Sequence, residues 1–212
     1  MYLLTTPHLY GGKVFDAVYV ISPSVKLDST WRHLINYRAK RGQKEEDFFF
    51  DHWDESVVQR IMDESAKLTE YHKKNNHQYA TSVCLVVDDM ADQQHILHAT
   101  GNSLLNSLFI RGRHFFLSVF VATQRPSLTS SILRTQASAL YIFKQRNYKD
   151  LDLLLTELSG WVPRKVLREM YDICTREKYH FMMINLLGKD IDHMFYWDLD
   201  KRLIVSKMLE DE

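Results

Sequence analysis

Polar side chains that could act on a phosphate group follow two apolar segments of the chain. The segment 82–89 (SVCLVVDD) ends in Asp88 and Asp89, and 35 residues later Gln124 follows the apolar segment 115–123 (FFLSVFVAT). Since parallel strands end at one edge of a sheet, where ligands bind, we expect these three side chains at the same edge. There the first carboxylate can hold Mg²⁺ through water, and the second can orient or deprotonate an attacking water molecule.

Simpler roles remain open for the same residues. Asp88 and Asp89 could form a strand-end turn that caps the next helix, and Gln124 could donate a hydrogen bond to a neighbouring strand. A metal-dependent nuclease would also use two carboxylates. It needs further acidic ligands, and the sequence does not bring Asp16 or Asp51 to the pair.

The surrounding pattern predicts strands that alternate with helices. Apolar and β-branched runs predict strands at 14–22, 82–89, 115–123, 139–144 and 181–186, with a hairpin at 195–199 and 203–205. Helical spacing predicts helices at 1–10 (closed by Gly11-Gly12), 28–44, 55–74, 92–110, 147–158 and 163–176. This order is typical of an α/β protein with a largely parallel sheet, and we expect one domain over residues 1–212.

Composition excludes several classes of protein. The 212 residues hold 27 Lys and Arg against 27 Asp and Glu, so no global positive field attracts nucleic acid. Cys84 and Cys174 stand far apart in apolar surroundings, as in a reducing compartment. Because no apolar run reaches the roughly 18–20 residues that span a bilayer and no signal segment is present, we expect a soluble cytoplasmic or nuclear protein without membrane contact.

The seven glycines can be compared directly with phosphate-binding loops. Neither G-x-G-x-x-G nor G-x-x-x-x-G-K-[ST] occurs. The nearest approach is Gly11-Gly12-Lys13, where Val14 replaces the hydroxyl residue that would bind the metal. These 212 residues therefore contain no recognisable phosphate-binding loop.

The segment Val121–Ser127 (VATQRPS) resembles the A-T-Q-R-P-S segment of the FtsK/HerA superfamily of DNA-translocating ATPases. Within that superfamily the chain is most similar to the poxvirus-type DNA packaging ATPases of large DNA viruses. The segments that carry this resemblance are Val14-Phe15-Asp16, Ile21-Ser22-Pro23, Asp28–Trp31, Leu85–Asp89, Gly112-Arg113-His114 and Ala122-Thr123-Gln124. The resemblance covers residues 1 to about 160, and residues 161–212 match only in general character.

The resemblance implies a P-loop NTPase-like fold of the RecA/ASCE type, with a mostly parallel sheet and helices on both faces. It implies ATP and Mg²⁺ as cofactors, with Asp88 of the Walker B segment on the metal, Asp89 on the attacking water and Gln124 on the γ-phosphate. Arg113 would be the finger supplied in trans to the next subunit, and Arg111, Arg125 and Arg134 are its rivals. The implied activity is ATP-driven packaging of double-stranded DNA by a homo-oligomeric ring, a hexamer, working with viral capsid or portal components in a virus factory or virion.

The chain departs from this family at its beginning. Met1 stands inside what resembles the helix that follows the phosphate loop, so the family's first strand and loop are missing from these residues. A gene model started at an internal methionine, a split gene or a decayed copy would each explain this. We therefore expect poor ATP hydrolysis or none from the chain as given, and the alternative is a non-catalytic remnant or interaction module of the same fold.

A basic run precedes an acidic segment near residue 45. It contains Arg32, Arg38, Lys40, Arg41 and Lys44, and the sequence EEDFFFDHWDE follows it. The run could contact DNA phosphates, or the neighbouring acids could compensate it on a solvated face. His95 and His98 form one helix-face pair without a third ligand, which is poor evidence for zinc.

Overall fold

A computed structural model describes residues 2–6, 9, 14–90, 93–98 and 103–210. The chain divides into two compact units: residues 1–124 with 128–133, and residues 125–127 with 134–212. Each unit contains its own four-stranded sheet. The expectation of one domain over the whole chain stays a prediction.

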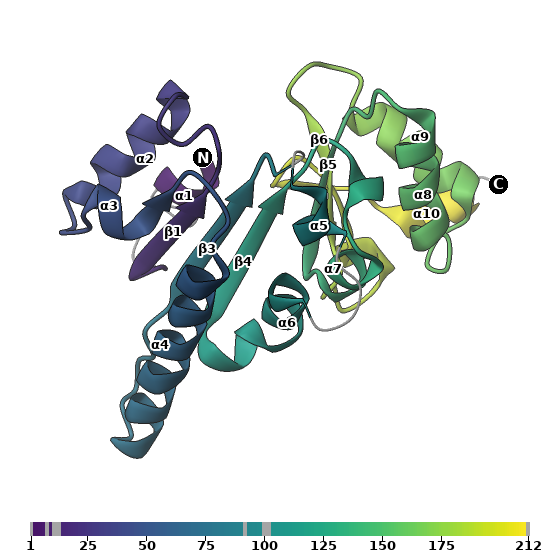
Figure 1. Cartoon of the computed structure of the whole chain (residues 1–212). Coiled ribbons are helices and arrows are strands. Elements are labelled where there is room, and N and C mark those ends of the chain that lie inside the picture. Colours follow the sequence, from purple (N-terminus) through teal and green to yellow (C-terminus); the bar gives the residue numbers. More distant parts are fainter. Residues whose placement is uncertain (1, 7–8, 10–13, 91–92, 99–102, 211–212) are drawn as a thin grey trace. The chain divides into compact units, whose positions relative to one another are not determined.

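The sheet of the first unit is parallel and has the strand order β2-β1-β3-β4. Figure 1 shows β1, β3 and β4 side by side in this order. Its strands are β1 (Ala17–Ile21), β2 (Phe49–Phe50), β3 (Val83–Asp88) and β4 (Leu117–Ala122). The register pairs Ile21 with Val87 and Asp88 with Ala122, so all four strands end at one edge. The predicted α/β fold with a parallel sheet is confirmed, and the short β2 is a strand that the sequence pattern does not predict.

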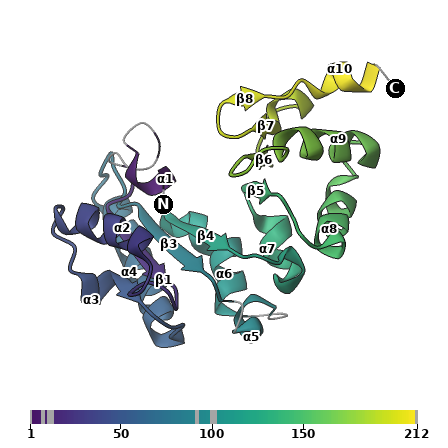
Figure 2. The ribbon, with the colours of Figure 1, turned by 90° about the horizontal axis from the view of Figure 1, so that it is seen from above.

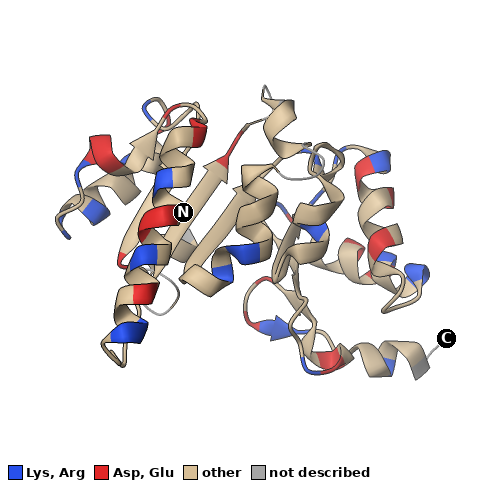
Figure 3. Cartoon of the chain, turned by 60° about the horizontal axis from the view of Figure 1, so that its bottom comes forward, with Lys and Arg blue, Asp and Glu red and all other residues tan. Residues whose placement is uncertain are grey.

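Helices cover both faces of this sheet, and the alternation of side chains along β3 explains why. Val83, Leu85 and Val87 lie in a core with α4 (Glu55–Lys74) and α6 (Leu104–Arg111), while Cys84 and Val86 lie in a second core with α2 (Ser29–Ala39). A strand buried on both faces must be apolar at nearly every position. Lys and Arg alternate with Asp and Glu along the solvent side of α4 (Figure 3).

Caps begin these helices where the sequence predicts them. The Asp28 side chain accepts a hydrogen bond from the Thr30 N–H at 2.7 Å, and Asp54 accepts one from the Ser56 N–H at 2.8 Å. The helix predicted over 92–110 is instead two short helices, α5 (Gln94–Leu97) and α6, because Ser103 caps a new start by accepting from the Asn106 N–H. At the amino end α1 covers Tyr2–Thr5, and the predicted closure at Gly11-Gly12 lies outside the described residues.

The sheet of the second unit is antiparallel, with the order β5-β6-β7-β8 (Figure 2). Its strands are β5 (Ala139–Phe143), β6 (Phe181–Asn185), β7 (Phe195–Trp197) and β8 (Lys201–Arg202). α8 (Tyr148–Leu158) and α9 (Arg164–Cys174) bury Leu155 and Leu167 against Ile142 and Met182 on one face of this sheet. A hairpin is present, but the prediction of its second strand at 203–205 is wrong: that strand is Lys201–Arg202, and Val205 begins α10 (Val205–Glu210).

The remaining short elements connect these parts. They are α3 (Glu45–Phe48), η1 (Gly112–Phe115), η2 (Pro126–Leu128), α7 (Ser131–Gln136) and η3 (Ile191–His193). No helix among the described residues is both long enough and apolar enough to cross a membrane.

Candidate functional site

The carboxyl edge of the first sheet gathers the polar residues that follow its strands. Asp88 is the last residue of β3, and its register partner on β4 is Ala122, two residues before Gln124. Neighbouring strands lie about 4.8 Å apart, so Asp88 and the segment that carries Gln124 leave the sheet side by side. Asp89 and Gln124 are exposed at this edge, where a ligand can reach them.

Ser22 also lies at this edge, and the sequence predicts no role for it. It follows β1 directly, is fully buried, and its hydroxyl donates a hydrogen bond to Asp88 Oδ2 at 3.3 Å. The Ser24 hydroxyl lies 3.0 Å from the Ser22 hydroxyl. The register explains this contact: Ile21 pairs with Val87, so the residues that follow them, Ser22 and Asp88, are also neighbours.

Burial and charge act on the Asp88 carboxylate in opposing ways. Loss of water around it raises its pKa, the Ser22 hydrogen bond lowers the pKa, and the negative charge of Asp89 raises it further. The net effect is a raised pKa, because a half-buried carboxylate is less stable when it is ionised. A cation bound beside Asp88 would act in the opposite direction, because its positive charge lowers the pKa of the carboxyl group.

Asp89 follows β3 directly and has a left-handed backbone conformation. Its φ of 53° is in the left-handed region, which Asp adopts more readily than most residues. The next residue, Met90, lies in the core with 1 % of its surface exposed, while Asp89 stays in solvent. The two carboxylates therefore have different surroundings: Asp88 is half-buried and accepts a hydrogen bond from Ser22, whereas Asp89 is exposed.

The other acidic candidates are not near Asp88. Asp16 precedes β1 at the opposite edge, where its side chain accepts a hydrogen bond from the Ser82 N–H at 2.8 Å. Asp51 follows β2 at the carboxyl edge, but it pairs with Lys26 at 2.5 Å and with His52 at 2.7 Å. The Lys26 hydrogen bond, followed by that of His52, lowers the pKa of Asp51 to about 2. Within the described ranges no three His, Cys, Asp or Glu residues form a metal-binding group.

Arg113 lies at the other end of β4. It is exposed on η1, before the strand begins at Leu117, whereas Gln124 follows the strand's last residue. Six residues of strand separate the two ends, about 20 Å. Arg113 and its neighbour Arg111 are therefore not brought to Asp88 within one chain.

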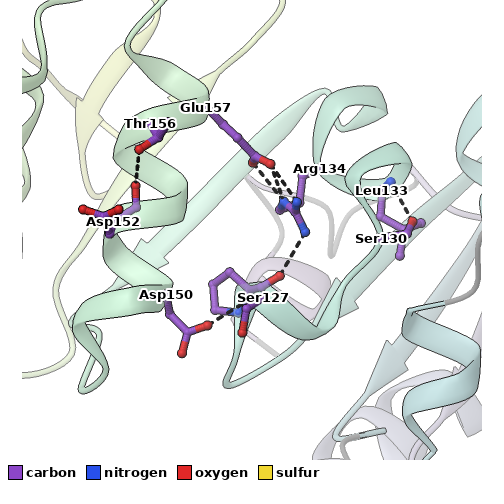
Figure 4. A network of polar contacts seen from close by, with 9 residues as sticks. Ser127, Ser130, Leu133, Arg134, Asp150, Asp152, Thr156 and Glu157 are labelled. Atoms are coloured by element: carbon purple, nitrogen blue, oxygen red, sulfur yellow. Dashed lines mark hydrogen bonds and ion pairs between the residues drawn. The ribbon is translucent and has the colours of Figure 1, made fainter.

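The other two candidate arginines are bound to acidic partners within the second unit. Arg134 donates to the Glu157 carboxylate at 2.7 Å and to the Pro126 carbonyl at 3.2 Å (Figure 4). Arg125 lies 3.6 Å from Asp150, whose side chain is 1 % exposed and also accepts from the Ser127 N–H at 3.1 Å. These contacts fix the segment that follows Gln124 onto α8.

The basic run begins on α2 and has one buried member. Arg38 is 2 % exposed, and its guanidinium donates to the carbonyls of Phe15 and Asp16, at 3.1 and 2.6 Å, and to Gln43. The pKa of Arg38 is lowered, and the main cause is its burial. Arg38 is therefore not available to DNA, and Arg32 pairs with Glu45 at 3.3 Å, as expected for an internally compensated face.

Comparison with known proteins identifies relatives of two kinds. No family model matches the chain. A curated sequence, the uncharacterized protein 075L of Invertebrate iridescent virus 6, is 21 % identical over 154 residues, which are 71 % of this chain and 57 % of that protein. The chain therefore spans a little over half the length of this relative.

Solved structures share the fold at low sequence identity. B204, the DNA-packaging ATPase from Sulfolobus Turreted Icosahedral Virus, matches with a TM-score of 0.50 and 12 % identity, over 87 % of this chain and 97 % of B204. B204 from Sulfolobus turreted icosahedral virus 2 in complex with ATP-gammaS matches with 0.50 and 13 % over the same shares. The pCW3 conjugation coupling protein TcpA, with ATPgS, matches with 0.51 and 15 %, over 92 % of this chain and 56 % of TcpA. The chain has the P-loop NTPase-like fold of these proteins.

Proposed function

We propose that the chain is part of a DNA-translocating ATPase of the genome-packaging type. The observation that carries the proposal is the shared edge of β3 and β4, where Asp88, Asp89 and Gln124 follow neighbouring parallel strands. The fold shared with B204 and TcpA, both solved with a nucleotide analogue, supports nucleotide binding at this edge. We infer that the protein forms a homo-oligomeric ring of six subunits. Its partners would be double-stranded DNA and viral capsid or portal components.

Each residue at the edge has a proposed task. Asp88, held by Ser22, is the ligand of Mg²⁺ on the nucleotide. Asp89, exposed beside it, orients and deprotonates the attacking water, and Gln124 senses the γ-phosphate. Arg113 serves a neighbouring subunit of the ring, since it lies at the opposite edge of its own sheet.

The phosphate loop of this site would come from a polypeptide segment outside the 212 residues. β4 is the last strand in its sheet, and among the described residues it pairs only with β3. Since the Val83 N–H donates to the Phe116 carbonyl, the alternation of a parallel ladder directs the backbone groups of Val119 and Val121 away from β3. A further strand can therefore add beside β4 and bring a loop of backbone N–H groups to Asp88.

The test begins with the coding sequence upstream of Met1 and the ATPase activity of the protein that includes it. We expect a strand followed by G-x-x-x-x-G-K-[ST], and Mg²⁺-dependent ATP hydrolysis that linear duplex DNA stimulates. Asp89→Asn should reduce kcat about 10²–10⁴-fold, as loss of a general base does. Asp63→Asn, an exposed acid on α4, is the matched control and should leave kcat unchanged.

Two results would contradict the proposal. A protein that contains the loop and still hydrolyses no ATP would be the non-catalytic module of the same fold. Full activity in Asp89→Asn would remove that carboxylate from the mechanism.

For Arg113, mixing Arg113→Ala with Asp89→Asn subunits should restore part of the activity, because a mixed ring contains interfaces with both groups intact.

A further inference from the structure

Two segments with both aromatic and basic side chains meet at one end of the second sheet. Residues 143–149 (FKQRNYK) leave β5, and residues 176–181 (REKYHF) lead into β6. They lie at the same end because Phe143 and Phe181 are register partners in the antiparallel pair of β5 and β6. We call these two segments the aromatic–basic surface.

The rings of this surface are turned towards solvent. Phe143 is 48 % exposed, Tyr148 68 % and Tyr179 91 %, and the Phe181 ring lies 4.9 Å from that of Phe143. The neighbouring residues Ile142 and Met182 point to the other face of the sheet, where they are buried against the helices. Large apolar side chains that are exposed side by side often mark an interaction site on a soluble protein.

The same two segments concentrate positive charge in a chain whose net charge is zero. They hold five cations and one carboxylate, that of Glu177. The cations are Lys144, Arg146, Lys149, Arg176 and Lys178, all exposed. As far as the structure describes the chain, none of the five forms an ion pair with a carboxylate.

Hydrogen bonds hold the backbone of both segments in place. The Gln145 N–H donates to the hydroxyl of Tyr171 on α9 at 2.7 Å, and the Asn147 side chain accepts from the Lys149 N–H at 2.9 Å. In the other segment Asp198 accepts from the Phe181 N–H at 3.2 Å and contacts the His180 ring at 2.6 Å. A ligand would therefore meet side chains on a fixed backbone, which lowers the entropy lost on binding.

We propose that the aromatic–basic surface binds an unpaired polynucleotide strand. Cations placed between exposed rings suit a ligand in which phosphates alternate with bases, since the rings stack on unpaired bases while Lys and Arg neutralise the backbone. The surface is unlike a protein-binding site, because protein interfaces are poor in Lys at their centre. Duplex DNA would engage the cations but would leave the rings without bases to stack on.

The test is a fluorescence anisotropy titration of the full chain with labelled (dT)₂₀ in low salt, without nucleotide. We expect the double variant Phe143→Ala, Tyr179→Ala to bind at least tenfold more weakly, while Tyr179→Phe keeps its affinity because it keeps a ring. Trp161→Ala is the matched ring control, 60 % exposed in the same unit, and should bind within twofold of wild type. Thermal melting checks that each variant is folded.

Charge is tested separately through the salt dependence. Lys144→Ala with Lys178→Ala should reduce the slope of log K against log salt by about 1.4, since each phosphate contact on a single strand contributes about 0.7. Lys189→Ala with Lys207→Ala removes two exposed cations elsewhere in the same unit and should leave the slope unchanged.

Parallel titrations identify the ligand. A U₂₀ strand should bind as (dT)₂₀ does if only stacking and phosphates are read, whereas a preference for one sugar would identify its source as RNA or DNA. Equal affinity for a 20-base-pair duplex, equal affinity for a poly-Glu peptide, or wild-type affinity in the ring variant would each overturn the proposal. Because no nucleotide is present, none of these results bears on the proposed ATPase site.

Discussion

Replacement of Arg38 by Met tests whether a buried cation holds α2 to the start of β1. The Arg38 guanidinium is 2 % exposed and donates to the carbonyls of Phe15 and Asp16 and to Gln43. Met has a similar length and helix propensity, so Arg38→Met removes the donors and leaves most of the packing. The two carbonyls then have no partner from this side chain.

Two opposing free energies decide the size of the effect. Hydrogen bonds from a charged donor contribute about 1.5–3 kcal/mol each, so losing the two to Phe15 and Asp16 costs about 3–6 kcal/mol. Met avoids the penalty of a buried charge, which the lowered pKa of Arg38 reflects, and this offsets part of the loss. We expect the free energy of unfolding to fall by about 2–4 kcal/mol, a large share of the roughly 5–15 kcal/mol of a typical domain.

Urea denaturation followed by circular dichroism measures this change, with a constant m value as the check that the unfolded state is unaltered. Arg32→Met on the same helix is the control: its ion pair with Glu45 is exposed, so it should cost under about 1 kcal/mol. Equal stability of Arg38→Met and wild type, or equal losses from both variants, would refute the assigned role of the buried guanidinium.

Three further changes test the first unit. Asp88→Asn should stabilise the protein above about pH 4 in metal-free buffer. Because the pKa of Asp88 is raised in the folded state, the wild type loses stability as the pH rises from 3.8, the ordinary pKa, to the pKa in the folded state. In urea melts from pH 4 to 8, the difference in unfolding free energy between variant and wild type should grow and then level off. A difference that is constant over this range would contradict the raised pKa. Gly112→Ala should cost about 1–3 kcal/mol by thermal melting, since its Cβ would lie 2.8 Å from the Leu117 carbonyl oxygen, whereas Gly160→Ala has open space and is the control. Leu85→Ala, fully buried on β3, should cost about 2–5 kcal/mol in the same assay, and a smaller loss would mean that the core closes around the change.

The central strand and the carboxyl edge could be predicted because both follow from local rules. Five apolar residues in succession before Asp88 require cover on both faces, and the structure divides them between two cores. The order strand, helix, strand brings Asp88 and Gln124 to one edge, since such connections make neighbouring parallel strands. Neither prediction needs the identity of a distant partner.

The features that could not be predicted all depend on such partners. In the sequence, Arg38 looks like one more exposed cation of a basic run, because the carbonyl groups that it binds are 22 and 23 residues away along the chain. The helices between β5 and β6 suggest a parallel pair, but the two strands are antiparallel, because α8 and α9 together return the chain in the opposite direction. Ser22 likewise acquires its partner only through the register of β1 with β3.

Arg113 illustrates how the fold limits a role that motif likeness alone leaves open. The Gly112-Arg113-His114 segment forms η1 before β4, and a strand of about 20 Å separates it from the edge that carries Asp88. One arginine side chain cannot cross that distance, so no rearrangement of the Arg113 side chain brings it to a nucleotide held by Asp88 of the same chain. A finger role for Arg113 therefore requires a second copy of the chain, and its activity in such a role would be evidence of the ring as much as of the residue.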